Sequence, residues 1–443
     1  MDEAIVADVP VQAGPEAPDR RIGSVDVLRG VAVLGILAVN IFTFGLPPMS
    51  FLRPTAAGGF AGLDRAAWWT VFLLFYYKMM PVFSMLFGAG LVMMAERFRA
   101  AGLTLRAFWY RRMLWLMAFG LLHGYLLWVG DILFLYGFCG MAVYAVRANR
   151  PRRLLIASLV LYAVSFVPVA GAGYWFEMMR DRMPAIEEKL EQRQPLTKSE
   201  EGAREQWENI RKLMDPTDDE LGGIVDTYRD GYSGIVIFRA PLYLNNTTFN
   251  LLFASFWPTA ALMLAGMALM RWGVFSAARS RLFYLVMAVS GYGAGIPLAW
   301  RSAAGMIGHD FSFVEVFRYD LIINHLGGPL VALGHVALVM LFVRSGIMRP
   351  LRHALASTGR MALSNYLGQS LICTTFFFGY GLGCYDTLGK AGLMAVVVSI
   401  WVLQLIVSPL WLAVFRFGPA EWLWRSLTYW RRQPVLRRPR PVP

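Results

Sequence analysis

Residues 25–46 read VDVLRGVAVLGILAVNIFTFGL, an apolar run interrupted by few polar side chains. At a rise of about 1.5 Å per residue, a helix of this length crosses the roughly 30 Å of hydrocarbon in a bilayer. The run is longer than the apolar core of a cleavable signal peptide, which spans about 7–15 residues. It is therefore predicted to be a retained transmembrane helix.

Apolar runs of similar length recur along the chain. The composition is 57% hydrophobic and 16% charged, with a mean hydropathy of +0.48, whereas soluble domains carry about 25% charged residues. The sequence predicts an all-α polytopic integral membrane protein with about ten transmembrane helices and one larger extracytoplasmic helical insertion. The predicted spans are 26–46, 66–95, 110–128, 131–147, 153–176, 249–270, 282–300, 314–343, 358–380 and 392–415.

Five segments follow from these spans. The insertion holds about half of all acidic residues, and its polar middle is predicted to form surface helices over the outer face. The segments are a disordered cytoplasmic N-terminus (1–20), helices one to five (21–176), the insertion (177–248), helices six to ten (249–416), and an interfacial cytoplasmic helix with a basic tail (417–443).

Arginines mark every second connection between the predicted spans, as expected for cytoplasmic loops. This pattern predicts a multi-pass membrane protein with both termini in the cytoplasm. It also explains the net charge of +13 without a nucleic-acid partner. The arginines near the span ends are Arg20, Arg21, Arg97, Arg99, Arg106, Arg111, Arg112, Arg147, Arg150, Arg152, Arg153, Arg271, Arg279, Arg281, Arg344, Arg349 and Arg352.

His123 and Asp131 are the first candidates for chemistry. A charged side chain inside a span costs at least about 2.5–3.5 kcal/mol, so it is rarely retained without a role. The tight turn at Gly130 folds span four back along span three, so Asp131 can point toward His123. A carboxylate that orients a histidine is a recurring general-base arrangement. The alternative is that His123 is a packed core residue and Asp131 only caps span four.

Two other groups of polar residues lie within predicted spans. Lys78 is too deep in span two to reach either surface, and it requires a carboxylate or a water-filled cavity; Asp131 is its predicted partner, with Asp320 second. Span eight carries Asp320, Asn324 and His325 ahead of Gly327-Gly328-Pro329, which is predicted to kink or interrupt the helix. For Lys78 the alternative is a structural ion pair. For span eight the alternative is a helix that begins late, so that its first charged residues lie at the membrane interface.

Several motifs are absent from the sequence. It has no Walker loop, dinucleotide-binding glycine fingerprint, nucleophile elbow or HExxH pattern. Neither the three cysteines nor the five histidines have metal-ligand spacing. A primary ATP-driven pump and a zinc protease are therefore disfavoured, and no metal is expected.

Several motifs resemble a known family. The residues Arg21-Ile22-Gly23-Ser24-Val25-Asp26-Val27-Leu28-Arg29-Gly30, followed by Asn40, are similar to the first span of membrane acyltransferases such as heparan-α-glucosaminide N-acetyltransferase. The Gly130-Asp131-Ile132-Leu133 turn and three longer stretches resemble the YeiB-like bacterial membrane proteins, named mainly as a domain of unknown function. Those stretches are Lys78 to Gly90, Gly359 to Tyr366 and Arg416 to Arg425.

The resemblance implies that residues 21–176 form an acyltransferase-like half. It also implies transfer of an acyl group from cytoplasmic acyl-CoA to a sugar, lipid or small molecule on the far side. Asn40 matches the asparagine of the acetyltransferase, but Phe51 stands where that family has its catalytic histidine. Either His123 replaces that histidine from another span, or the protein is not an acetyltransferase.

The leading hypothesis is thus a transmembrane acyltransferase. His123 would be the base, oriented by Asp131, and Lys78 would stabilise the thioester oxygen. Arg111 and Arg112 would bind CoA phosphates. The residues expected to bind the acceptor are Asn40, Asp320, Asn324 and His325.

Two alternatives remain. One is a secondary transporter or flippase that uses the buried lysine, aspartates and histidines. The other, weaker one is a partner-binding membrane protein that acts through its outer segment. A homo-oligomer is compatible with each of these functions.

Overall fold

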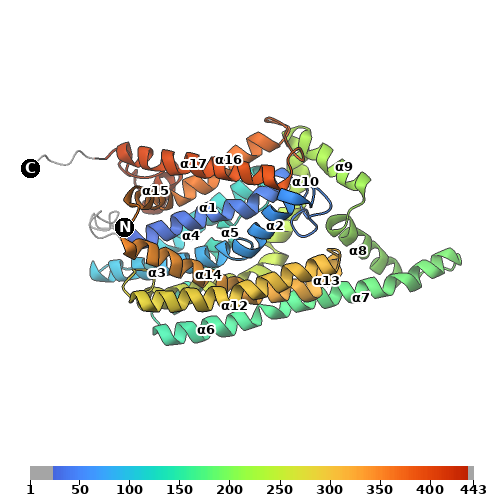
Figure 1. Ribbon diagram of the computed structural model, residues 1–443, viewed down its shortest axis with the longest axis horizontal. Helices are drawn as coiled ribbons and strands as arrows, with labels where there is room; N and C mark the ends of the chain where they lie inside the picture. Colours follow the sequence, from blue (N-terminus) through green and yellow to red (C-terminus); the bar gives the residue numbers. More distant parts are fainter. Residues whose placement is uncertain (1–22, 438–443) are drawn as a thin grey trace, which may run out of the picture.

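The computed structural model describes residues 23–437, and the predicted disordered segment 1–20 lies outside this range (Figure 1). The described residues form helices and no named strand. Short π-helical turns at Leu251–Ser255 and Val316–Asp320 precede α11 and α14. The helices are α1 (Gly23–Gly45), α2 (Gly62–Leu74), α3 (Met79–Ala100), α4 (Arg106–Leu126), α5 (Leu133–Val143), α6 (Pro151–Val164), α7 (Phe166–Glu191), α8 (Lys198–Met214), α9 (Asp218–Arg229), α10 (Tyr232–Thr247), α11 (Phe256–Arg271), α12 (Arg281–Gly308), α13 (Phe313–Glu315), α14 (Leu321–Ser345), α15 (Arg349–Arg360), α16 (Ala362–Phe377), α17 (Lys390–Val414) and α18 (Pro419–Tyr429).

The all-α membrane fold is confirmed. Within residues 23–437, seven helical segments are long and apolar enough to cross a bilayer, compared with the ten predicted. The other three predicted spans correspond to α4, α5 and α16, which are shorter or carry several charges. The seven segments are Gly23–Gly45, Gly62–Ala100, Pro151–Glu191, Leu251–Arg271, Arg281–Gly308, Phe313–Ser345 and Lys390–Val414.

Helix α1 lies at the centre of the bundle. Of its most apolar window 72% is buried, compared with 17% for the segment α6–α7 and 28% for α12 and for α17. The peripheral helices therefore present their apolar side chains outward, as lipid-facing helices do. Close backbone approach holds α1 against α15, because a Cβ at Gly30 would lie 2.1 Å from the Leu355 carbonyl oxygen.

Two irregularities interrupt the long helices. The predicted second span is divided into α2 and α3 by a break at residues 75–78, where Tyr77 has a left-handed φ of 60°. The predicted interruption at Gly327-Gly328-Pro329 is absent, because α14 continues through these residues, whereas the alternative of a kink stays a prediction. These glycines instead allow close packing: a Cβ at Gly328 would lie 2.4 Å from the Tyr77 carbonyl oxygen.

The two ends of the bundle differ. Helices α8, α9 and α10 lie at the opposite end from α15, and α7 extends beyond that insertion end (Figure 1). Arginines gather at the other end, here called the basic end, where Arg344 donates to the Ala277 carbonyl at 2.6 Å and Arg271 donates to the carbonyls of Arg147 and Asn149. The loops that carry these arginines therefore lie at the end of the bundle opposite the insertion (Figure 1).

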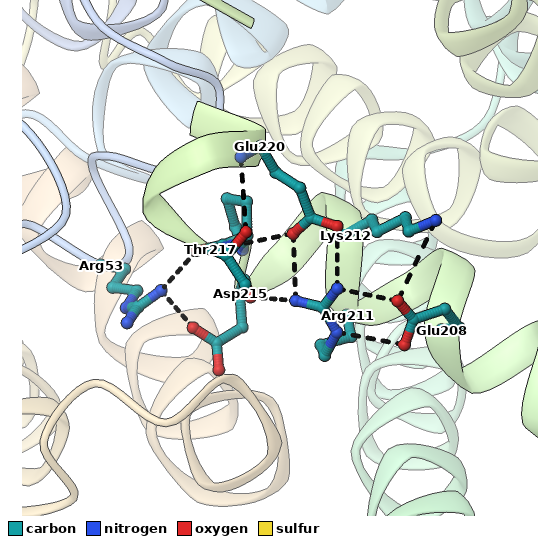
Figure 2. Close-up of polar contacts among 8 residues, drawn as sticks. Arg53, Glu208, Arg211, Lys212, Asp215, Thr217 and Glu220 are labelled. Atoms are coloured by element: carbon teal, nitrogen blue, oxygen red, sulfur yellow. Dashed lines mark hydrogen bonds and ion pairs between the residues drawn. The ribbon is translucent and has the colours of Figure 1, made fainter. Parts of the chain in front are cut away.

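The insertion is fixed by a network of ion pairs (Figure 2). Arg211 donates to Glu208 and to Glu220, each at 2.8 Å, and Arg53 from the α1–α2 loop pairs with Asp215. The hydrogen bonds from Arg211 and from the Thr217 cap lower the pKa of Glu220 to about 2. The predicted polar surface helices correspond to α8 and α9, whereas α10 packs against α4.

Candidate functional site

A hydrogen-bonded chain of three side chains lies inside the bundle. His123 Nδ1 lies 2.9 Å from Asp131 Oδ1, and His123 Nε2 lies 2.8 Å from Ser370 Oγ. His123 and Ser370 are 2% and 1% exposed. An ionised carboxylate only accepts hydrogen bonds, so Nδ1 of a neutral His123 carries the proton and Nε2 accepts the Ser370 hydroxyl proton. This is the geometry of a serine–histidine–aspartate triad.

Two helices and a turn bring these residues together. His123 lies in the last turn of α4, and Asp131 lies in the turn before α5, where its Oδ2 accepts the Phe134 amide at 2.9 Å. Ser370 lies on α16, which is distant in sequence. Tyr243 of α10 donates to the Gly120 carbonyl at 2.8 Å and to Asp131 at 3.4 Å. Asp131 is thus oriented from three sides.

Gly120 and Gly124 allow this close packing. A Cβ at Gly120 would lie 2.3 Å from the Phe134 nitrogen and 2.7 Å from Asp131 Oδ2. A Cβ at Gly124 would lie 1.9 Å from the Tyr243 ring. Any larger side chain at either position would therefore displace a residue that contacts or supports the triad.

A cavity of about 290 Å³ opens beside the triad toward the basic end. Five arginines line it, together with Asp26 and Glu421. Asp26 is paired with Arg29 at 3.0 Å, so the lining keeps an excess of positive charge. The arginines are Arg29, Arg97, Arg112, Arg360 and Arg425, and deeper lining residues include Phe83, Phe87, Leu116, Ile132, Leu133, Tyr136 and Tyr366.

Tyr366 lies between the cavity and the triad. Its side chain lines the cavity, and its ring centroid is 5.1 Å from that of His123. It precedes Ser370 by one turn of α16. His123 and Ser370 are not among the residues that line the cavity, so Tyr366 is a cavity-lining residue that also contacts the triad.

Helix α18 forms one wall of the cavity mouth. Arg112 stacks on Trp424 at 3.5 Å, and the Trp424 indole donates to the Arg112 carbonyl at 2.9 Å. Glu421 accepts the Leu363 amide at 2.7 Å and the Ser364 hydroxyl at 2.5 Å, which caps α16. Burial raises the pKa of Glu421, although its hydrogen bonds to Ser364 and Leu363 act in the opposite direction.

Comparison with known proteins gives the family. The chain is 30% identical over 417 residues to the uncharacterized protein YeiB of Escherichia coli (strain K12), covering 91% of this chain and 95% of that protein. It is 29% identical over 435 residues to the uncharacterized protein YxaH of Bacillus subtilis (strain 168), covering 96% and 98%. The chain belongs to the YeiB-like family. Residues 269–431 also match the model of a protein family of unknown function, DUF418. No solved structure matches the chain.

In this YeiB-like protein, the residues that match the DUF418 model include only part of the candidate site. Ser370, Tyr366 and Glu421 lie within residues 269–431, whereas His123 and Asp131 lie before them. An uncharacterized 39.9 kDa protein of Bacillus acidopullulyticus matches 95% of the chain at 25% identity, so the similarity to relatives extends over both parts of the site.

Lys78 lies away from the triad. The predicted ion pair with Asp131 is wrong: Lys78 donates to the Phe72 carbonyl at 2.8 Å and to Asn324 at 2.7 Å. The break after α2 turns Lys78 toward α14, and Asp131 is engaged by His123. Lys78 is also absent from the cavity lining, so it is not positioned to stabilise a thioester bound there.

The other predicted site residues are also dispersed. Asp320, the second predicted partner of Lys78, pairs instead with His309 at 3.0 Å. His325 contacts the Ser165 hydroxyl at 2.8 Å and stacks on Tyr162. Asn40 is half-buried near the end of α1. None of these residues lines the cavity.

The two predicted CoA-binding arginines differ in position. Arg112 lines the cavity and Arg111 does not. Arg111 faces Trp430 at 5.9 Å instead, because neighbouring residues on a helix point in different directions.

Sequence reasoning missed several residues of the site. Ser370 gives no local signal, since it is a serine in an apolar helix without a glycine-flanked turn. Tyr243 was assigned to the outer insertion, yet its hydroxyl reaches Gly120. Five helices, α1, α3, α4, α15 and α18, each contribute one of the cavity arginines, which no spacing along the chain predicts.

Proposed function

We propose that this protein is an acyltransferase of the bacterial inner membrane. Its basic end would face the cytoplasm and bind acyl-CoA, and the acyl group would be transferred to an acceptor reached from the insertion end. The observation that carries this proposal is the arginine-lined cavity that ends beside His123 and Asp131.

The cavity suits an anionic, amphiphilic donor. Guanidinium groups bind phosphates through paired hydrogen bonds, and five of them surround the mouth. The deeper wall is apolar, with Phe83, Leu116 and Leu133 among its residues. Acyl-CoA combines phosphates at one end with a thioester and an apolar chain at the other, so its two ends match the two parts of the cavity.

The reacting end of the donor would lie near Tyr366. His123 is the general base, because its Nε2 carries a lone pair when Asp131 accepts the Nδ1 proton. Asp131 is a positioning residue that holds this tautomer. The acceptor, whether sugar, lipid or small molecule, would meet the acyl group on the far side of Tyr366.

Binding of acetyl-CoA and longer acyl-CoAs to the purified protein in detergent tests the proposal. Arg97→Ala should weaken binding about 10- to 150-fold, because a hydrogen bond to a charged group contributes about 1.5–3 kcal/mol. Arg99→Ala is the matched control, since Arg99 lies in the same last turn of α3 but outside the cavity lining.

The expected result is saturable binding that Arg97→Ala weakens and Arg99→Ala leaves intact. Absence of binding to any acyl-CoA would exclude this donor. The secondary transporter or flippase would then be the better function. Proton-coupled uptake without CoA consumption would support it, with Lys78 as the first residue to test, because this lysine is fully buried at a helix break.

A further inference from the structure

We propose that Ser370 is a covalent nucleophile that holds the acyl group as an ester between donor and acceptor. This inference rests on the proposed function for the identity of the acyl group. The activation of Ser370 itself rests on geometry alone.

The orientation of the Ser370 hydroxyl favours this role over a structural one. Serines in apolar helices commonly donate to the carbonyl four residues earlier, as Ser84, Ser290 and Ser399 do at 2.7–2.9 Å. For Ser370 the corresponding distance to the Tyr366 carbonyl is 3.4 Å, whereas its distance to His123 Nε2 is 2.8 Å. The hydroxyl is therefore directed at the histidine.

Asp131 completes the activation. It fixes the proton on Nδ1, which leaves Nε2 free to accept the serine proton. The same carboxylate accepts the Phe134 amide at 2.9 Å, so its orientation is independent of the histidine. A serine, a histidine and an aspartate in this order form an activated nucleophile on any fold, because the arrangement is recognised by geometry.

The reaction has two balanced steps. In the first, Ser370 Oγ attacks the thioester carbonyl carbon and gives its proton to His123 Nε2. The C–S bond breaks, and the CoA thiolate leaves with that proton. In the second step, the acceptor hydroxyl or amine attacks the serine ester and gives its proton to His123. The bond between the acyl carbon and Ser370 Oγ breaks, and Oγ recovers the proton from His123 Nε2.

An unsatisfied donor lies beside the triad. The Trp128 indole nitrogen is buried and has no hydrogen-bond partner among the described residues. Its ring centroid is 6.3 Å from that of His123. A buried N–H group without a partner is able to donate to an oxyanion that forms within its reach.

A covalent intermediate fits the placement of the site. The cavity lies on the side of Ser370 that faces the basic end, and Tyr366, one turn before Ser370, is part of its lining. An ester on Ser370 would allow the donor to leave before the acceptor arrives. Donor and acceptor would then never need to occupy the bundle together.

Labelling with diisopropyl fluorophosphate tests the nucleophile independently of any acyl donor. The purified full-length protein is treated with the reagent, and the modified residue is located by peptide mass spectrometry. We expect modification of Ser370 that is lost in Ser370→Ala and slowed at least about 100-fold in His123→Ala. Ser158→Ala, which removes another buried hydroxyl that donates to the Ala261 carbonyl at 2.7 Å, should keep the label.

Release of free CoA from acyl-CoA is measured on the same samples. Labelling of Ser370 together with CoA release that falls more than about 10³-fold in Ser370→Ala supports the proposal. Tyr366→Ala removes the side chain that shields Ser370, and melting temperatures verify that each variant is folded. Absence of label in both the wild type and Tyr366→Ala overturns the nucleophile.

The two proposals fail in different ways. CoA release that persists in Ser370→Ala overturns the covalent step and leaves His123 as a base that acts directly on the acceptor. Label on Ser370 without CoA release from any acyl-CoA supports the nucleophile and overturns acyl-CoA as the donor.

Discussion

Asp131→Asn is the substitution that separates orientation of His123 from its presence. Asp131 accepts the His123 ring at 2.9 Å and the Phe134 amide at 2.9 Å, through different oxygens. Asparagine has a single acceptor oxygen, so it serves only one of these donors. If its oxygen keeps Phe134, its NH₂ group faces His123 and favours the tautomer protonated on Nε2, which no longer accepts from Ser370.

The expected loss is large in rate and small in stability. A wrong histidine tautomer costs about 10⁴ in kcat in a serine–histidine–aspartate triad, which corresponds to roughly 5 kcal/mol. One lost hydrogen bond to a charged group destabilises the fold by about 1.5–3 kcal/mol. The assay is CoA release from acyl-CoA by the purified protein, with the melting temperature measured in parallel.

Asp64→Asn provides the matched control. Asp64 accepts the Ala391 amide at the start of α17 at 2.8 Å, which is the same capping role without a histidine. We expect it to retain CoA release within about threefold of the wild type. If a folded Asp131→Asn variant also stays within tenfold, Asp131 does not set the tautomer and the reasoning is refuted.

Three further predictions concern the fold around the site. Gly120→Ala should destabilise the protein by about 1–3 kcal/mol and reduce CoA release, because its Cβ would lie 2.3 Å from a backbone nitrogen. Gly368→Ala is the control, because a Cβ there has no atom within 4 Å and should leave the melting temperature unchanged. Equal melting temperatures of the Gly120→Ala and Gly368→Ala variants would contradict the prediction. Asn324→Leu should cost about 3 kcal/mol or more, because it leaves the buried Lys78 ammonium with one hydrogen-bond partner fewer. The double variant Lys78→Met/Asn324→Leu, which replaces both polar groups by apolar ones, should be more stable than Asn324→Leu alone. The reverse order of melting temperatures would refute this prediction. Because burial raises the folded-state pKa of Glu421 above 4.5, its stabilising contribution is present below pH 4.5 and is lost as the pH rises through that higher pKa. The melting temperature of the wild type relative to Glu421→Gln should therefore fall as the pH is raised from 4.5, and a constant difference would exclude this contribution.

Patterns between residues close in sequence predicted the helical membrane fold and one contact of the candidate site. Long apolar runs predicted a polytopic helical membrane protein, because a single helix satisfies its own backbone in lipid. The juxtaposition of His123 and Asp131 was also predicted, since only a tight turn separates the two. Both inferences depend on neighbours in sequence, which is the information that one chain provides.

Contacts between distant segments were not predictable in the same way. Ser370 meets His123 through the packing of α16 against the turn after α4, and the partner of Lys78 was mistaken because helix register places it toward α14. Helix α14 is not interrupted at Gly327-Gly328-Pro329, because glycine serves close packing as well as flexibility. Tertiary packing decides each of these positions.

The position of α18 has a consequence for biogenesis. Glu421 and Trp424, which cap α16 and stack on Arg112, are synthesised after every transmembrane helix. While the ribosome still covers this segment, the start of α16 is uncapped and the cavity lacks one wall. A chain truncated before Pro419 would therefore insert the preceding membrane helices without the α18 wall of the cavity, and translation of α18 is the step that completes this wall.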